Sequence, residues 1–391
     1  MNEQRLTNER VFIATCALGT EKPVAYELKA LGFRIADRND GKISFHADVS
    51  EIPKMNIWSR TADRFLLQIG SSIQATTFDD LFAGLYSIPW EEWIPKDGRV
   101  IVAKAKTKGS KLTSIPSIQS VSQKAIITKL QDHYKIDRLS DNGPPFPFWV
   151  YLNNNQATIA LDTSGEGLHR RGYRLVSFKA PLRETIACSL LALSRWQPKI
   201  AFIDPFCGGG TIPIEAAMIA MNIAPGIRRE FVSERWPFLS TAIWREERRI
   251  ARSKITLRNE AIRIMGSDTD GAALDIAKEN ARRAGVVDII QWKKIPMEQV
   301  RSEWEYGYIL SNPPYGERLT TPDHVQKLIM QMRHFPKHLP TWSFFFLSPE
   351  EKFPVLFQKT AAKMYPIQNS TVSARFFAFW GPKPKKTRER G

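Results

Sequence analysis

The sequence has few cysteines and no long run of apolar residues. Its three cysteines, Cys16, Cys188 and Cys207, are odd in number and lack the close spacing of zinc ligands. We therefore expect free thiols in a reducing, cytoplasmic environment, and no metal site. The longest strongly apolar run, "WSFFFL", is far shorter than the roughly 20 residues that span a bilayer. The polar start of the sequence is unlike a signal peptide, so no membrane segment is expected.

Acidic residues are scarce relative to basic ones. The chain carries 56 Lys and Arg against 40 Asp and Glu, a net charge of +16. Residues 1–165 hold 20 basic against 18 acidic side chains, and residues 166–391 hold 36 against 22. Because phosphates gain most from a basic surface, this charge favours an RNA or DNA partner, with solubility alone as the alternative.

The order of predicted elements divides the chain into three regions. Residues 1–70 have the order β-α-β-β-α-β of a ferredoxin-like domain, with a hairpin turn at Asn39, Asp40 and Gly41. Residues 71–165 hold two helices, a strand and a closing hairpin around residues 153–155. Residues 166–391 alternate strands with helices, which predicts an α/β unit whose parallel sheet has helices on both faces. This third region includes a basic helical insertion at residues 228–263 and a basic tail from Pro382.

Seven basic residues and no acidic ones lie between Arg99 and Gln131. This stretch is the best phosphate-binding candidate in the first half of the chain, with a solvated strand face as the alternative. The predicted RNA-binding residues are Arg99, Lys104, Lys106, Lys108, Lys111, Lys124 and Lys129.

Two turns of the third region suit an adenosylated amino acid. In "DPFCGGGT", Asp204 ends a strand and Gly208, Gly209 and Gly210 lead into a helix. A carboxylate binds an ammonium group and a helix N-terminus binds a carboxylate, so together they suit an amino acid zwitterion. In "GSDTD", Asp268 ends a neighbouring strand, where it can accept hydrogen bonds from ribose hydroxyls. A structural tight turn and simple helix capping are the alternatives, and capping is the role we expect for Asp270.

The third turn, "SNPPY", follows a predicted strand that contains the hydrophobic run Tyr308, Ile309 and Leu310. The lone pair of an exocyclic amine on a base is delocalised into the ring. Hydrogen-bond acceptors that face the N–H groups of this amine oppose that delocalisation as the new bond forms. The Asn312 side chain and the backbone carbonyl near Pro313 supply such acceptors, the prolines fix the geometry, and Tyr315 offers a ring for stacking. These residues predict methyl transfer to a base amine.

These motifs resemble those of a known family. "DPFCGGGTIPIEAA", "GSDTDGAALDIAKENARRAGV" and "SNPPYGERL" resemble motifs I, II and IV of S-adenosylmethionine-dependent methyltransferases that modify exocyclic amines. "HRRGYR" and "APLRETIA" resemble the segment before that domain in THUMP-containing RNA methyltransferases of the RlmL/YpsC type. The resemblance implies a Rossmann-like class I domain with a mostly parallel seven-stranded sheet, preceded by α+β ferredoxin-like and THUMP domains that bind RNA.

The resemblance also implies a function and a set of site residues. The reaction would be methylation of guanine N2 in 23S ribosomal RNA, free or in a large-subunit assembly intermediate, with S-adenosyl-L-methionine as cofactor. Pro296 stands near the point where many relatives have an Asp for the cofactor adenine. The implied cofactor-binding residues are Thr185, Asp204, Phe206, Gly208, Gly210, Thr211 and Asp268, and the implied catalytic residues are Asn312, Pro313 and Tyr315.

Three other functions remain open at this point. A tRNA guanine-N2 methyltransferase uses the same domains and the same four-residue motif. A DNA adenine-N6 methyltransferase shares "NPPY", although the THUMP-like region argues against it. A non-catalytic RNA-binding assembly factor would be expected to have lost the Gly-rich turn or Asn312, and neither is lost.

Overall fold

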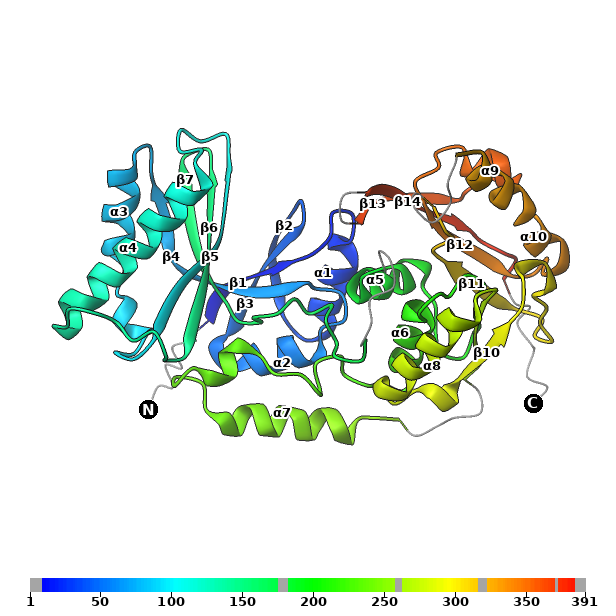
Figure 1. The fold of residues 1–391 in the computed structure, drawn as a ribbon, viewed down its shortest axis with the longest axis horizontal. Coiled ribbons are helices and arrows are strands. Elements are labelled where there is room, and N and C mark those ends of the chain that lie inside the picture. Colours follow the sequence, from blue (N-terminus) through cyan, green and yellow to red (C-terminus); the bar gives the residue numbers. More distant parts are fainter. Residues whose placement is uncertain (1–8, 175–181, 257–261, 316–321, 370–371, 384–391) are drawn as a thin grey trace, which may run out of the picture.

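The structure, a computed structural model, describes residues 9–174, 182–256, 262–315, 322–369 and 372–383. Two seven-stranded sheets lie side by side along the longest axis of the molecule (Figure 1). Some predicted features fall outside the described residues. They are residues 316–319 of "NPPYGERL", residues 180 and 181 of "APLRETIA", residues 257–261 of the basic insertion and residues 384–391 of the tail.

The first sheet has the strand order β2-β3-β1-β4-β7-β6-β5. Neighbouring strands are antiparallel except β5 and β6, which are parallel. Its strands are β1 (Glu9–Thr15), β2 (Arg34–Asn39), β3 (Lys42–Asp48), β4 (Arg64–Gln74), β5 (Arg99–Lys108), β6 (Pro145–Asn153) and β7 (Gln156–Asp162). Its helices are α1 (Glu21–Ala30), α2 (Ile52–Trp58), α3 (Phe78–Tyr86) and α4 (Ile115–Tyr134).

Local sequence explains several of these boundaries. Gly41 adopts φ +69° in the β2–β3 turn, where the hairpin was predicted. Thr77 begins α3 with a capping box, because its side chain accepts from the Asp80 backbone N–H and the Asp80 carboxylate accepts from that of Thr77. The order β-α-β-β-α-β in the first region follows from such local signals.

Strand β4 belongs to both halves of this sheet. Its first residues pair with β1, from Arg64 to Leu67, and it pairs with β7 from Leu66 to Gln74. The register of the second ladder shifts between Ile69 and Ile73, next to Gly70 at φ +66°. Residue 70, the predicted end of the first region, thus lies at an irregularity within one continuous strand.

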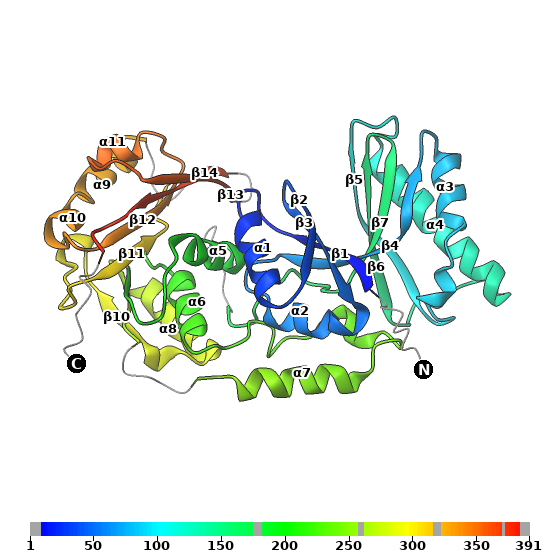
Figure 2. The same cartoon turned by 180° about the vertical axis from the view of Figure 1, so that it is seen from behind.

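The helices of the first sheet pack on one of its faces. Phe65 and Leu67 point into the main core with residues of these helices, whereas Leu66 and Trp149 belong to a small separate cluster on the other face. Figures 1 and 2 show α3 and α4 on the outer side of strands β4–β7, so the opposite face turns toward the middle of the molecule.

The second sheet has the order β10-β9-β8-β11-β12-β14-β13. Strands β8 to β12 are parallel, so the seven-stranded sheet is mostly parallel, as the resemblance implied. Strand β14 is antiparallel to both of its neighbours, β12 and β13. Its strands are β8 (Ala201–Asp204), β9 (Ile264–Asp268), β10 (Ile290–Lys294), β11 (Gly307–Ser311), β12 (Ser343–Ser348), β13 (Lys363–Asn369) and β14 (Val372–Phe379). The helices of this half of the chain are α5 (Glu184–Ser194), α6 (Thr211–Ala220), α7 (Thr241–Ser253), α8 (Gly271–Ala284), α9 (Pro322–Gln331), α10 (His334–His338) and α11 (Phe353–Phe357), and all but α7 accompany the second sheet.

Both faces of the second sheet are covered. Phe202, Leu310 and Phe345 point into the core shared with α5 and α6. Alternate residues such as Ile203 and Phe344 point into a second, aromatic core beneath α9, α10 and α11. This layering confirms the predicted α/β unit with helices on both faces.

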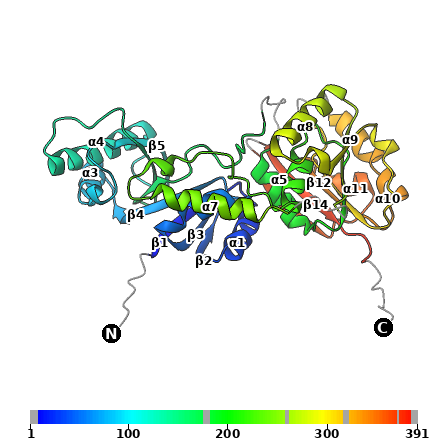
Figure 3. The same ribbon diagram turned by 90° about the horizontal axis from the view of Figure 1, so that it is seen from below.

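Helix α7 of the basic insertion packs against the part of the chain that forms the first sheet. Figure 3 shows α7 lying along the module of β1–β3 rather than over the second sheet. Its buried side packs on α2, and the Trp58 indole N–H donates to Glu247 at 2.6 Å. Trp244 and Ala251 are the buried residues of this helix. RNA contact by its exposed basic residues stays a prediction.

Candidate functional site

A cavity of about 550 Å³ opens beyond the carboxyl ends of β8, β9, β10 and β11. The strand order reverses at β8, with β9 and β10 on one side and β11 and β12 on the other. Ligands of doubly wound sheets bind at such a point. Asp204, Asp268 and Asn312 all line the cavity, so the structure brings the three predicted turns together.

The Gly-rich turn forms one wall of the cavity. Gly208 and Gly209 line it, and at Gly208, with φ +50°, an added Cβ would meet nothing within 4 Å. Gly210 instead faces the protein, because a Cβ there would lie 2.8 Å from Cη2 of Trp292 and 3.0 Å from Cβ of Ala277. Gly208 thus leaves room for a ligand, and Gly210 allows close packing of the loop.

Asp204 places a buried carboxyl group at the cavity. It is 1% exposed, and its Oδ1 accepts from the Phe206 backbone N–H and from the Ser311 hydroxyl. Burial raises the pKa of Asp204 to about 7, although these two hydrogen bonds oppose the shift. A buried carboxylate of this kind could hold an ammonium group, which would satisfy its charge.

The two aspartates of the second turn have different roles. Asp268 accepts from the Gly208 backbone N–H at 2.9 Å and from the Asp270 backbone N–H at 3.0 Å, so it ties its own turn to the Gly-rich loop. Asp270 accepts from the Ala272 backbone N–H and caps α8, as predicted. The Asp268 carboxylate also lines the cavity, where it could accept from a ligand hydroxyl.

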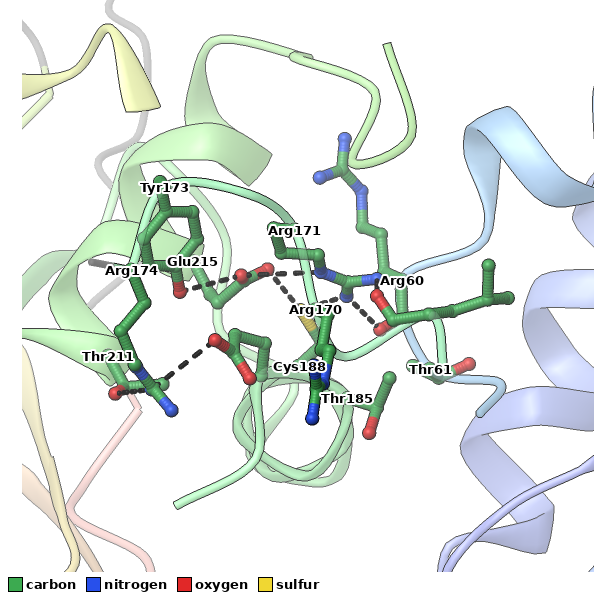
Figure 4. A network of polar contacts seen from close by, with 12 residues as sticks. Arg60, Thr61, Arg170, Arg171, Tyr173, Arg174, Thr185, Cys188, Thr211 and Glu215 are labelled. Carbon is green, nitrogen blue, oxygen red and sulfur yellow. Dashed lines mark hydrogen bonds and ion pairs between the residues drawn. The ribbon is translucent and has the colours of Figure 1, made fainter. Parts of the chain in front are cut away.

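Arg174 is a cavity residue that the sequence reasoning missed. Its Nη2 donates to Oγ1 of Thr211, the first residue of α6, at 2.6 Å (Figure 4). The same atom lies 3.3 Å from the Glu184 carboxylate. A guanidinium beside a helix N-terminus forms a binding site for a carboxylate. The only sequence signal for Arg174 was its place in "HRRGYR".

Asn312 carries an unsatisfied acceptor. Its Oδ1 is buried and has no hydrogen-bond partner within the described part of the chain, although the residue lines the cavity. An acceptor without a partner costs free energy, so such an atom at a cavity wall points to a ligand donor.

Not every predicted site residue lines this cavity. Phe206 and Thr211 line the cavity, as predicted. Pro313 is buried and does not line it, whereas the next residue, Pro314, does. The Tyr315 hydroxyl accepts from Nδ2 of Asn369 at 3.4 Å. Thr185 is not among the residues that line the cavity. Its hydroxyl instead donates to Asp63, the residue before β4 of the first sheet, at 2.6 Å.

The segment after β10 forms another part of the cavity wall. Pro296, Met297 and Glu298 line the cavity there. Pro296 and Met297 could pack on the flat face of an adenine, where many relatives are expected to use an Asp.

The predicted basic residues are divided between two faces of the first sheet. Lys104 and Lys106 line a separate groove on the face without helices. Lys124 and Lys129 belong to α4, whose buried residues pack on the opposite face. The seven residues therefore do not form one patch.

The described residues contain neither a cluster of metal ligands nor a membrane-spanning helix. No group of three or more His, Cys, Asp and Glu side chains among them could hold a metal ion. In the same residues, no helix combines the length and the apolar character needed to cross a membrane.

Comparison with known proteins agrees with this geometry. Residues 11–66 match the RlmL ferredoxin-like domain, residues 75–162 the THUMP domain, and residues 171–376 the RMKL-like methyltransferase domain. YpsC of Bacillus subtilis (strain 168), which carries the name of an RNA methyltransferase, is 39% identical over 380 residues, 96% of this chain and 98% of YpsC. The structure of SMU.472, described as a methyltransferase complexed with SAH, has a TM-score of 0.91 and 36% identity, covering 97% of this chain and all of that one.

A longer relative matches this chain with part of its length. The ribosomal RNA large subunit methyltransferase K/L of Psychromonas ingrahamii is 33% identical over 340 residues. The match covers 85% of this chain and 45% of the K/L protein. The matched domains, their order and the cavity at the strand ends together show that the chain belongs to the S-adenosylmethionine-dependent, THUMP-containing RNA methyltransferases of the RlmL/YpsC type.

Proposed function

We propose that the protein transfers a methyl group from S-adenosyl-L-methionine to the exocyclic N2 amine of a guanine in 23S ribosomal RNA. The observation that carries the proposal is Asn312, a residue of the cavity wall whose buried Oδ1 has no hydrogen-bond partner among the described residues. The name of the K/L relative supports large-subunit ribosomal RNA as the substrate.

The cavity residues fit the methionine and ribose parts of the cofactor. Asp204 would bind its ammonium group, and Arg174 with the first turn of α6 would bind its carboxylate. Asp268 would accept from the ribose hydroxyls. Gly208 leaves the space that the methionine part needs. When bound, the cofactor supplies an electrophilic methyl group on a sulfonium.

Asn312 would position the amine of the target base. Its Oδ1 and the backbone carbonyl near Pro313 accept from the two N–H groups, which directs the nitrogen lone pair toward the methyl group. Pro313 and Pro314 hold this geometry without needing backbone donors. Tyr315 would stack on the base. Orientation of this kind accounts for much of the rate enhancement, so no covalent nucleophile is required.

Mass spectrometry of nucleosides from a deletion strain tests the proposal. We expect 23S ribosomal RNA to lose one N2-methylguanosine, which the wild-type protein restores and Asn312→Ala does not. Loss from tRNA would instead identify a tRNA guanine-N2 methyltransferase, and loss of N6-methyladenine from DNA a DNA enzyme. Unchanged nucleosides with retained RNA binding would identify a non-catalytic assembly factor.

A further inference from the structure

A side-chain hydrogen bond joins the carboxyl ends of β8 and β11. Asp204 is the last residue of β8 and Ser311 is the last residue of β11, and the two strands are parallel neighbours. The Ser311 hydroxyl donates to Oδ1 of Asp204, which lies 107 residues away in the sequence. Because Asn312 directly follows Ser311, this bond connects the strand that carries Asn312 to the carboxylate at the Gly-rich turn.

The bond is shielded from solvent at both ends. Ser311 is 0% exposed and Asp204 is 1% exposed. Other buried serines of this half of the chain have local partners, since Ser189 and Ser194 donate to backbone carbonyls of their own helix, α5. Ser311 instead donates to an ionisable side chain on another strand. A hydrogen bond of this kind is stronger when its acceptor is charged.

The two carboxylate oxygens of Asp204 have different surroundings. Oδ1 accepts from the Ser311 hydroxyl and from the Phe206 backbone N–H, whereas Oδ2 has no donor in the part of the chain that the structure describes. Asp204 lines the cavity, and a buried carboxylate oxygen normally accepts a hydrogen bond. The two donors therefore fix the orientation of the carboxylate through Oδ1 and leave Oδ2 for a ligand.

We propose that Ser311 is a positioning residue for the cofactor, because it holds Oδ1 of Asp204 so that Oδ2 can accept from the ammonium group of S-adenosyl-L-methionine. That this ammonium group binds Asp204 rests on the proposed function. Ser311 also precedes Asn312, so the same hydroxyl fixes the methyl donor relative to the residue that would hold the acceptor amine. The alignment of the two reactants depends on such fixed distances.

The Ser311 hydroxyl also favours the charged form of Asp204. Burial raises the pKa of this carboxyl group to about 7, and the hydrogen bond from Ser311 is the largest effect that opposes the rise. The negative charge of Asp268 acts in the other direction and raises the pKa. Without the Ser311 hydroxyl, the pKa of Asp204 should rise further, and a smaller fraction of the carboxyl group would be ionised at neutral pH.

Other titratable groups near the cavity leave this effect visible. Burial raises the pKa of the Cys207 thiol well above its usual value, so the thiol stays neutral near pH 7. Burial also raises the pKa of Glu184 to about 7, but Glu184 pairs with Arg174 and not with Asp204. Loss of the Ser311 hydroxyl leaves these groups unchanged. The remaining charged residues that line the cavity are Asp268, Asp270 and Glu298.

Calorimetry with S-adenosylhomocysteine at about pH 6 and about pH 8.5 tests the proposal. Loss of a hydrogen bond to a charged group should raise the pKa of Asp204 by about one. Ser311→Ala should therefore lower the affinity about tenfold at the lower pH and change it little at the higher pH. Ser311→Thr keeps the hydroxyl and should keep the wild-type ratio of the two affinities. An unchanged ratio in Ser311→Ala, or an equal loss at both pH values, would overturn the proposal.

Ser267→Ala is the matched control. Ser267 is also 0% exposed, and it precedes Asp268 as Ser311 precedes Asn312. Its hydroxyl has no hydrogen-bond partner among the residues that the structure describes. This variant should keep the wild-type ratio of affinities, and a change as large as that of Ser311→Ala would contradict the role of the hydrogen bond. Thermal unfolding of each ligand-free variant shows that it is folded.

The Asp204→Asn background separates this proposal from the assignment of Asp204 to the cofactor. In that background, the further substitution Ser311→Ala should not change the ratio of affinities. A further change would show that Ser311 acts through another group, which would sink the proposal. If Asp204→Asn alone left the affinity unchanged at both pH values, the assignment of Asp204 would fail, and this proposal with it. The assay needs no methyl transfer, so a wrong acceptor base would leave it unaffected.

Discussion

The Glu215 carboxylate lies 3.5 Å from Nε of Arg171, and both side chains are at most 2% exposed. Glu215 also accepts from the Tyr173 hydroxyl at 3.0 Å and from the Cys188 thiol at 2.9 Å (Figure 4). The guanidinium of Arg171 donates to the carbonyls of Leu168, Ser59 and Arg60. Helix α6, which begins at the Gly-rich loop and contains Glu215, is therefore connected through Arg171 to the backbone of Ser59 and Arg60 beside the first sheet.

Glu215→Gln should destabilise the whole protein. The substitution leaves the buried Arg171 charge uncompensated, which costs about 3–5 kcal/mol in comparable buried pairs. We expect a lower free energy of unfolding in urea. Glu246→Gln is the control, because the Glu246–Arg249 pair is exposed and solvent-screened ion pairs of this kind contribute little to stability. Equal effects of the two substitutions would contradict the structural role of the buried pair.

Asn312→Ala should abolish methylation while leaving cofactor affinity intact. Loss of one preorganised hydrogen-bonding group typically lowers the rate by about 10²- to 10³-fold. Single-turnover methyl transfer measures the rate, and calorimetry with S-adenosylhomocysteine measures the affinity. Asn39→Ala, in the exposed β2–β3 turn, should change neither. Parallel loss of rate and affinity in Asn312→Ala would refute the assigned role.

Cofactor affinity should rise with pH through Asp204. The carboxyl pKa is raised from 3.8 to about 7 in the ligand-free protein, and the cofactor ammonium requires the ionised form. Affinity should therefore increase by up to about tenfold per pH unit below pH 7 and level off above it. Calorimetry across this range tests the effect, and Asp204→Asn should bind weakly with a flat profile.

The same carboxyl group has the opposite effect on stability. Between pH 3.8 and about 7 the folded protein keeps a proton that the unfolded chain has released. The stability from this group is therefore fully present at low pH and is lost as pH rises through the folded pKa. In the ligand-free protein, Asp204→Asn should therefore remove this decrease of the free energy of unfolding with rising pH. An identical pH dependence of unfolding in the wild type and the variant would contradict it.

Gly210→Ala and Gly208→Ala should affect stability and cofactor affinity differently. At Gly210 the new Cβ would meet Trp292 and Ala277 with φ at +83°, so both stability and cofactor affinity should fall. At Gly208 the Cβ would point into open space, at a backbone cost of about 1 kcal/mol. That variant should unfold nearly like the wild type but bind S-adenosylhomocysteine weakly. Thermal unfolding and calorimetry on both variants separate the two effects.

Local patterns in the sequence predicted most of the fold. The turn at Gly41, the cap at Asp270 and the buried strand before Asn312 are each determined by residues close in sequence, so they could be read directly. The seven-stranded topology came from the resemblance to the family.

Features that depend on long-range contacts could not be read in this way. Sequence spacing does not reveal that Arg174 reaches Thr211, that Thr185 bonds to Asp63, or that Lys42 meets Tyr151 across the sheet. The bulge before Lys104 in β5 has a similar effect, because one irregular residue decides which face a lysine occupies.

The shared strand β4 also limits how the enzyme can choose its substrate. With no linker between the ferredoxin-like and THUMP halves, their spacing is set by backbone hydrogen bonds and cannot stretch to suit different RNAs. The two halves would therefore present a surface of fixed spacing to an RNA, and the enzyme would select RNAs whose shape fits that spacing.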